Sequence, residues 1–263
     1  MNGAATVEIL DRNTLESRGT ITGFKSPRQA INLNDGYIYV SDWGSNAIYK
    51  VNVSTSSIVD SLKNCNGPEG MFLAEGKLFA ANSGGYVLDS SVSVYDLNNW
   101  THEGNIQVGI NPIEIIDDAL GNLWVLCSGY SDWNGTGGDR YSSLISFDPK
   151  TSNILTDYTN PILTDHPSKL RSNLAGNKLY FIQDSYVGNI MEFSINQVSY
   201  PTQPLISHSA YGLAIDGLNG NLLVLDALDY QSPGKALLYA DSGNIIDSSS
   251  VGLIPSVAIN TKY

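Results

Sequence analysis

The sequence predicts an all-β fold assembled from a repeated unit, and two observations carry this prediction. A short segment that usually contains proline recurs six times, about 40 to 55 residues apart, a period typical of propellers and solenoids. In the first five copies a glycine turn and an apolar strand follow the segment: GYIYVSD, GKLFAAN, GNLWVLC, GNKLYFIQ and GNLLVLD. The aligned positions are Pro27, Pro68, Pro112, Pro167, Tyr211 and Pro255.

Each unit also contains a third and a fourth strand. After a variable loop come NAIYKVNV, SSVSVYDL, SLISFDPK, GNIMEFSI and KALLYADS, and polar turns such as NVSTSS and DPKTSN then lead to an edge strand. Units of four short strands cannot bury their own faces, and they become stable when they pack radially as blades. We therefore predict a β-propeller with four-stranded antiparallel blades, forming a single domain over residues 1–263.

The two ends of the chain are expected to share one blade. Residues 5–23, ATVEILDRNTLESRGTITG, match the third and fourth strands of a unit, and residues 252–260, GLIPSVAIN, match a first strand. Pairing them would cover strand edges that otherwise stay open. The prediction is five complete blades and a sixth, shared by the termini, that lacks its second strand.

Composition narrows the classes of partner. The 263 residues are 42% hydrophobic, and the formal net charge of −12 repels the phosphate backbone of nucleic acids and anionic membranes. Cys65 and Cys127 form no CxxC motif, and we expect both thiols to be reduced because they fall in different blades. No segment has the roughly 18 apolar residues of a membrane span, and the first residues lack the pattern of a signal peptide. We expect a monomer.

Several longer strings resemble one family of propellers. The runs FKSPRQAINLNDGYIYVSDWGSNAIYKVNV, NGPEGMFLAEGKLFAANSGGY, GNLWVLCSGY, YGLAID and DALDYQSPGKALLYADSG are similar to YVTN-type (YncE-like) surface lipoproteins of Bacteroidota, which have seven blades. The resemblance covers most of the chain. It implies an extracytoplasmic location at the cell surface or outer membrane. It also implies capture of a corrinoid, a vitamin B12-like ligand, for an outer-membrane cobalamin transporter.

The same resemblance implies that this chain is shortened. Family members complete about one and a half further blades, with a signal peptide and lipobox, before the part that resembles ATVEILD. We therefore expect an N-terminally truncated version of a seven-bladed protein, in which six blade units are visible.

A candidate ligand face follows from strand direction. Loops that leave the second strand and loops that enter the first strand of each blade fall on the same side of the predicted disc, and these loops collect aromatic and polar residues that can anchor and orient a ligand. Two alternatives stand beside this interpretation: the aromatic rings pack between blades, or the polar residues cap turns. The candidate ligand-binding residues are Trp43, Asn82, Tyr86, Tyr130, Trp133, Tyr186, Tyr211, Asp226 and Tyr230.

Catalysis is the weaker hypothesis. His102, His166 and His208 are the only histidines, and no GxSxG, HExxH or P-loop string occurs. Glu69, beside Pro68, could line the central channel as a carboxylate base, but the ligands of a divalent ion do not accompany it. We therefore predict no catalytic residue, no metal site and no cofactor. The alternative to ligand capture is a protein-interaction or adhesin scaffold that uses the same aromatic loops.

Overall fold

The computed structural model describes residues 5–33, 35–132, 134–135, 137–185 and 188–258. Its contacts divide the chain into two compact units, Met1–Ile115 and Ile116–Tyr263. The single domain stays a prediction from the sequence. No helix in the described residues is both long enough and apolar enough to cross a membrane.

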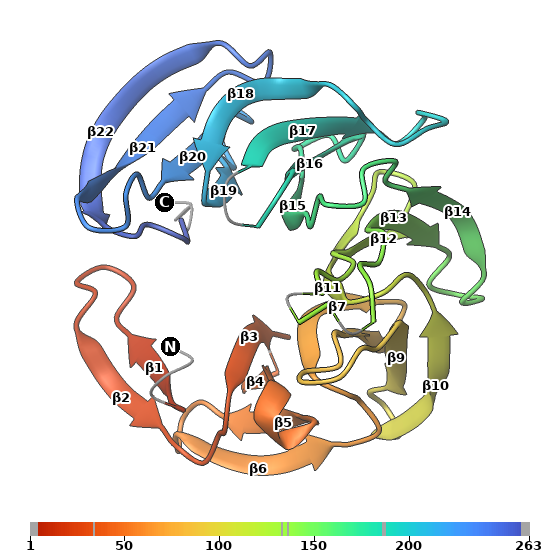
Figure 1. The fold of residues 1–263 in the computed structure, drawn as a ribbon. Helices are drawn as coiled ribbons and strands as arrows, with labels where there is room; N and C mark the ends of the chain where they lie inside the picture. Colours follow the sequence, from red (N-terminus) through yellow and green to blue (C-terminus); the bar gives the residue numbers. More distant parts are fainter. Residues whose placement is uncertain (1–4, 34, 133, 136, 186–187, 259–263) are drawn as a thin grey trace. The chain divides into compact units, whose positions relative to one another are not determined.

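The N-terminal unit consists of a two-stranded sheet followed by two four-stranded sheets (Figure 1). In each sheet the strands follow one another in chain order and pair antiparallel. A short 3-10 helix, η2 (Trp43–Ser45), connects β4 to β5. The strands are β1 (Val7–Leu10) and β2 (Ser17–Ile21); β3 (Pro27–Asn32), β4 (Tyr37–Asp42), β5 (Ala47–Asn52) and β6 (Ser57–Leu62); and β7 (Pro68–Ala74), β8 (Lys77–Asn82), β9 (Ser91–Asp96) and β10 (Thr101–Gln107).

Three further four-stranded sheets follow (Figure 1). The boundary between the two units falls within β11, the first strand of the first of these sheets. The strands are β11 (Pro112–Asp117), β12 (Leu123–Cys127), β13 (Ser143–Phe147) and β14 (Ile154–Thr159); β15 (Ser168–Ser172), β16 (Lys178–Ile182), β17 (Gly188–Ser194) and β18 (Pro204–Ala210); and β19 (Gly212–Ile215), β20 (Leu222–Asp226), β21 (Pro233–Tyr239) and β22 (Ile245–Leu253).

Burial explains the difference between middle and outer strands. Every residue of β12 (LWVLC) and β13 (SLISF) is buried, so both faces of these strands are covered. β12 is a continuous apolar run, whereas β13 also buries Ser143 and Ser146. The outer strand β14, ILTDYT, shows only partly buried positions that alternate with exposed ones. The repeat therefore predicted the strands correctly, including the third and fourth strands β1 and β2 at the N-terminus.

The blade shared by the termini does not form within the described residues. Gly252 and Leu253, the first two residues of the expected first strand, instead complete β22, and residues 254–258 adopt no strand. The chain leaves the extended conformation at Ile254, whose φ is 49°. Ser256 and Pro255 lie against Gly212 and Gly234 of the same last sheet. Ile259 and Asn260, the rest of that segment, lie outside the described residues.

The β1–β2 sheet depends on the sheet that follows it. Its Val7 and Ile9 pack against a buried cluster that includes Ile21 of β2 and Val40 and Val51 of β4 and β5. A lone two-stranded hairpin is marginally stable in water. The hairpin is therefore held in place chiefly by this apolar contact.

Candidate functional site

The residue at the end of a second strand holds the neighbouring loops in place. In β4 the carboxylate of Asp42 accepts hydrogen bonds from the backbone N–H groups of Lys25 (2.7 Å), Ser26 (3.2 Å) and Ser45 (2.9 Å). The last of these caps η2 and fixes the position of Trp43. A polar side chain at this position therefore stabilises the loops that contain the candidate site residues.

Asn82, the equivalent residue of β8, also makes its contacts within the protein. Its amide nitrogen donates to the Oγ atoms of Ser91 (2.9 Å) and Ser93 (2.8 Å), and its Oδ1 accepts from the N–H of Asn66 (3.2 Å). Only 1% of Asn82 is exposed. These contacts favour the structural role over direct ligand contact.

Asp226, at the end of β20, combines a turn cap with an imidazole contact. Its Oδ1 accepts from the N–H of Leu228 (2.7 Å), and its Oδ2 lies 2.9 Å from Nε2 of His208 on β18. Asp226 is buried, whereas His208 is partly exposed. The cap was the alternative role considered from the sequence, and the histidine contact is new.

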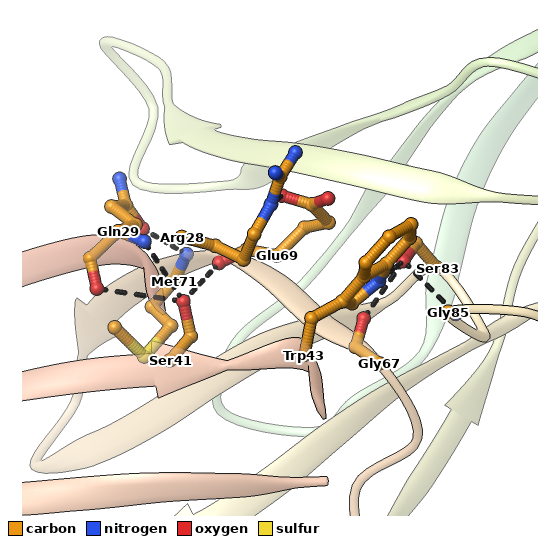
Figure 2. Close-up of polar contacts among 9 residues, drawn as sticks. All are labelled: Arg28, Gln29, Ser41, Trp43, Gly67, Glu69, Met71, Ser83 and Gly85. Carbon is orange, nitrogen blue, oxygen red and sulfur yellow. Dashed lines mark hydrogen bonds and ion pairs between the residues drawn. The ribbon is translucent and has the colours of Figure 1, made fainter. Parts of the chain in front are cut away.

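Trp43 is anchored to the neighbouring sheet by its indole N–H. The Nε1 atom donates a 2.5 Å hydrogen bond to Oγ of Ser83, and that hydroxyl donates in turn to the carbonyl of Gly67 at 2.8 Å (Figure 2). Gly67 has a φ of +55°, and a Cβ there would lie 2.7 Å from the indole nitrogen and 2.2 Å from the N atom of Gly85. Only glycine allows this close approach.

A second, exposed aromatic ring lies beside the ring of Trp43. Tyr86 lies 5.6 Å from Trp43 between ring centroids, with 38° between the ring planes, and 94% of Tyr86 is exposed. The next two residues, Val87 and Leu88, are exposed as well. A half-buried indole thus supports an apolar loop that reaches into solvent.

A cation completes this cluster. The guanidinium carbon of Arg28 lies 5.2 Å from the centre of the Trp43 ring, and its Nε donates to Oε2 of Glu69 at 2.7 Å (Figure 2). The hydroxyl of Ser41 donates to the carbonyl of Glu69 at 2.7 Å, so the carboxylate projects from a strand that is itself held to the sheet containing Arg28. We call Arg28, Trp43, Glu69, Ser83 and Tyr86 the Trp43 cluster.

A smaller aromatic pair lies in the C-terminal unit. Tyr211 and Tyr230 meet edge to face, with centroids 5.5 Å apart and an interplanar angle of 88°. Tyr230 is 40% exposed and projects from the turn that follows Asp226. Two backbone N–H groups, of Ser232 and Gln231, donate to Asp229 in that turn and hold the pKa of its carboxyl below the usual value.

The remaining candidates do not add to either group. Tyr130 lies in the loop after β12, where it exchanges two backbone hydrogen bonds with Arg140. Trp133 and Tyr186 lie outside the described residues. Among the described residues no three His, Cys, Asp or Glu side chains gather in a way that could hold a metal ion.

Arg28 and Ser83 are the members of the Trp43 cluster that the sequence reasoning missed. The signal for Arg28 lay in the repeat, because Arg28 and Glu69 directly follow the aligned Pro27 and Pro68. Opposite charges at equivalent positions of consecutive first strands indicate an ion pair. Ser83 follows Asn82 and carried no comparable signal.

Solved structures show which fold these sheets build, although no family profile and no curated protein sequence matches the chain. Hydrazine synthase from Kuenenia stuttgartiensis aligns over 97% of this chain and 83% of its own, with a TM-score of 0.77 and 13% identity. A quinoprotein alcohol dehydrogenase-like protein from Bacteroides thetaiotaomicron aligns over 93% of this chain, with a TM-score of 0.67 and 15% identity. This chain spans 60% of the length of the second protein.

The chain has the β-propeller fold. The sequence prediction of an all-β propeller with four-stranded antiparallel blades is confirmed. At 13% and 15% identity the similarity extends to the fold alone. Propellers host many unrelated activities, so a function has to be argued from the side chains of this chain.

Proposed function

We propose that this β-propeller is a binding protein that captures a ligand on the Trp43 cluster. One observation carries the proposal: a tyrosine that is 94% exposed rests on a tryptophan anchored by a hydrogen bond. Aromatic rings offer large, rigid contact area, and a ring already held in position loses little conformational freedom when a ligand binds. Tyr86 and Trp43 therefore form a ready surface for a flat or apolar ligand.

A corrinoid is the first ligand to test. The resemblance to surface lipoproteins that capture corrinoids suggests it, and a flat macrocycle bordered by amides suits aromatic rings that lie beside polar groups. In this proposal the protein acts as a monomer at the cell surface and passes its ligand to an outer-membrane transporter. It contributes binding rather than catalysis.

A protein partner is the second candidate, and one observation favours it. Tyr86, Val87 and Leu88 are three consecutive exposed apolar residues in one loop. Exposed apolar patches of this kind often mark protein interfaces, although single exposed apolar side chains are ordinary. The same loop would then insert into a partner instead of covering a small ligand.

A thermal-shift titration tests small-ligand capture. The protein is titrated with cyanocobalamin, cobinamide and a panel of other flat cofactors, because a ligand that binds only the folded state raises the melting temperature. The Tyr86→Ala variant should lose the shift, whereas Leu218→Ala, which removes an exposed leucine in the C-terminal unit, should keep it. Shifts that survive in Tyr86→Ala would place the ligand elsewhere. No shift with any compound would favour the protein partner.

A further inference from the structure

We infer that Arg28 makes the Trp43 cluster selective for ring ligands that carry an anionic group, either a carboxylate or a phosphate. The inference rests on the proposed function, since it names the ligand chemistry of the same surface. It adds a polar requirement that the aromatic rings alone would not impose.

Arg28 keeps hydrogen-bond donors available for a ligand. Its Nε is bound to Glu69, but within the described part of the chain Nη1 and Nη2 make no hydrogen bond. Figure 2 shows these terminal nitrogens pointing away from Ser41 and Gly67. The Arg28 side chain is 27% exposed, and the edge that carries Nη1 and Nη2 has donors to offer a ligand. That edge is the planar fork that binds carboxylate and phosphate oxygens through two parallel hydrogen bonds.

Two contacts hold the guanidinium group of Arg28 in position. Glu69 holds the Nε edge at 2.7 Å, and the indole of Trp43 lies under the guanidinium. Both contacts restrict a side chain that would otherwise lose considerable rotamer freedom on binding. Arg28 is therefore oriented in advance, beside the ring surface that Trp43 and Tyr86 provide.

Binding at this surface requires a ring and an anionic group in the same ligand. The Arg28–Glu69 pair is neutral as a unit, and the chain carries a formal net charge of −12, so a free anion gains little long-range attraction here. A ligand ring that stacks on Tyr86 and Trp43 would place its anionic substituent beside Arg28. The contact with Arg28 then forms within the complex and needs no separate encounter. Recognition then depends on short-range geometry and varies weakly with salt.

The competing interpretation is a structural ion pair that only joins β3 to β7. Other bonds already join the same two sheets: Ser41 of β4 donates to the carbonyl of Glu69, and the N–H of Met71 of β7 donates to Oε1 of Gln29 of β3 (Figure 2). The two interpretations differ in what removal of Arg28 does to ligand selectivity. A structural pair would change the melting temperature and leave the preference for anionic ligands unaltered.

The experiment compares flavin mononucleotide with riboflavin, which share one flat ring system and differ by a phosphate. Fluorescence titration of the intact protein should show tighter binding of the mononucleotide by about 10- to 100-fold, as expected for charge-assisted hydrogen bonds. Arg28→Gln should remove this preference, so that the two flavins bind with equal affinity. Arg28→Lys keeps the charge but lacks the planar fork, so it should retain only part of the preference for the mononucleotide. This variant replaces Arg28→Gln in the test if Arg28→Gln does not fold.

The outcomes separate the two proposals. Equal affinity for both flavins, lost in Tyr86→Ala, would overturn the role of Arg28 and keep ring capture. A preference that persists in both Arg28 variants would also overturn it. Inorganic phosphate that binds as tightly as flavin mononucleotide would contradict the requirement for a ring. Failure of both flavins to bind would count against the proposed function itself, and the inference would fall with it.

Discussion

The indole nitrogen of Trp43, which follows β4, and the hydroxyl of Ser83, which follows β8, are joined by a 2.5 Å hydrogen bond between neighbouring sheets. Trp43 is therefore both a packing residue and the support of an exposed ring. Its replacement by alanine would mix lost stability with lost binding. Variants that separate the two effects are more informative.

Trp43→Phe deletes the indole donor and keeps an aromatic ring. We expect the free energy of unfolding to fall by about 1 kcal/mol, the usual net worth of one hydrogen bond, while ligand binding is largely retained. Urea denaturation measures the first and titration the second. Unchanged stability would show that the bond to Ser83 contributes nothing.

Tyr86→Ala removes the exposed ring. Because so little of this side chain is buried, we expect unfolding stability to change by less than about 0.5 kcal/mol. Ligand binding should weaken by about 1–3 kcal/mol, as truncation of an exposed anchor does. A melting temperature that falls together with the affinity would mean that Tyr86 holds its loop rather than the ligand.

Asn82→Ala should behave in the opposite way. It removes an amide that bonds Ser91, Ser93 and the N–H of Asn66 in a buried site. Leaving such groups unsatisfied costs about 1–3 kcal/mol, and we expect a stability loss of this size with ligand affinity unchanged in the fraction that stays folded. Lost affinity without lost stability would restore the ligand role first considered for Asn82.

The Tyr211–Tyr230 pair can be measured by a double-mutant cycle. Edge-to-face rings contribute about 0.5–1.5 kcal/mol beyond their buried area, so Tyr211→Leu and Tyr230→Leu should show a coupling energy of that size in unfolding experiments. Additive effects of the two substitutions would show that the rings act independently. The same variants, tested for binding, show whether this pair takes part in ligand capture.

The thiol of Cys65 gives a pH prediction. Burial raises its pKa to about 11, above the value of about 8.5 for an exposed thiol. The folded state thus favours the protonated form. The stability that follows is fully present below pH 8.5 and is lost as the pH rises through 11. In a Cys127→Ala background, Ellman's reagent should react slowly with the folded protein at pH 8 and quickly after denaturation. A mass two units below the dithiol form would instead reveal a disulfide in the native chain.

The strands could be predicted because the same short sequence pattern, a proline and then a glycine turn, recurs from one blade to the next. Pro27 and Pro68 pair in register with Asp42 and Asn82, the last residues of the second strands. A proline is tolerated at the first residue of a strand, where its missing N–H interrupts no ladder. Pro27 and Pro68 therefore marked the starts of β3 and β7, and the glycine turn after each marked the start of the next strand.

The candidate site was harder to predict from the sequence, because it depends on the course of the loops and on contacts between residues of two neighbouring sheets. Tyr86 reaches Trp43 through a turn in which Gly84 and Gly85 have φ angles of 91° and 66°. No pattern in the letters NSGGY predicts where that turn leads. For polar residues at strand ends, such as Asp226, the sequence allows either a ligand contact or a turn cap, and their hydrogen-bond partners distinguish the two.

The dependence of the β1–β2 hairpin on the next sheet has a consequence for the order in which the protein opens. Val7 and Ile9 lose their apolar contacts if β4 and β5 unfold, whereas the sheet that contains β4 and β5 shares a second buried cluster with β7–β9. Amides of β1 should therefore exchange with deuterium through local opening well before those of β4. In forced or thermal unfolding the hairpin should detach first, in a local transition that precedes the cooperative unfolding of the other sheets.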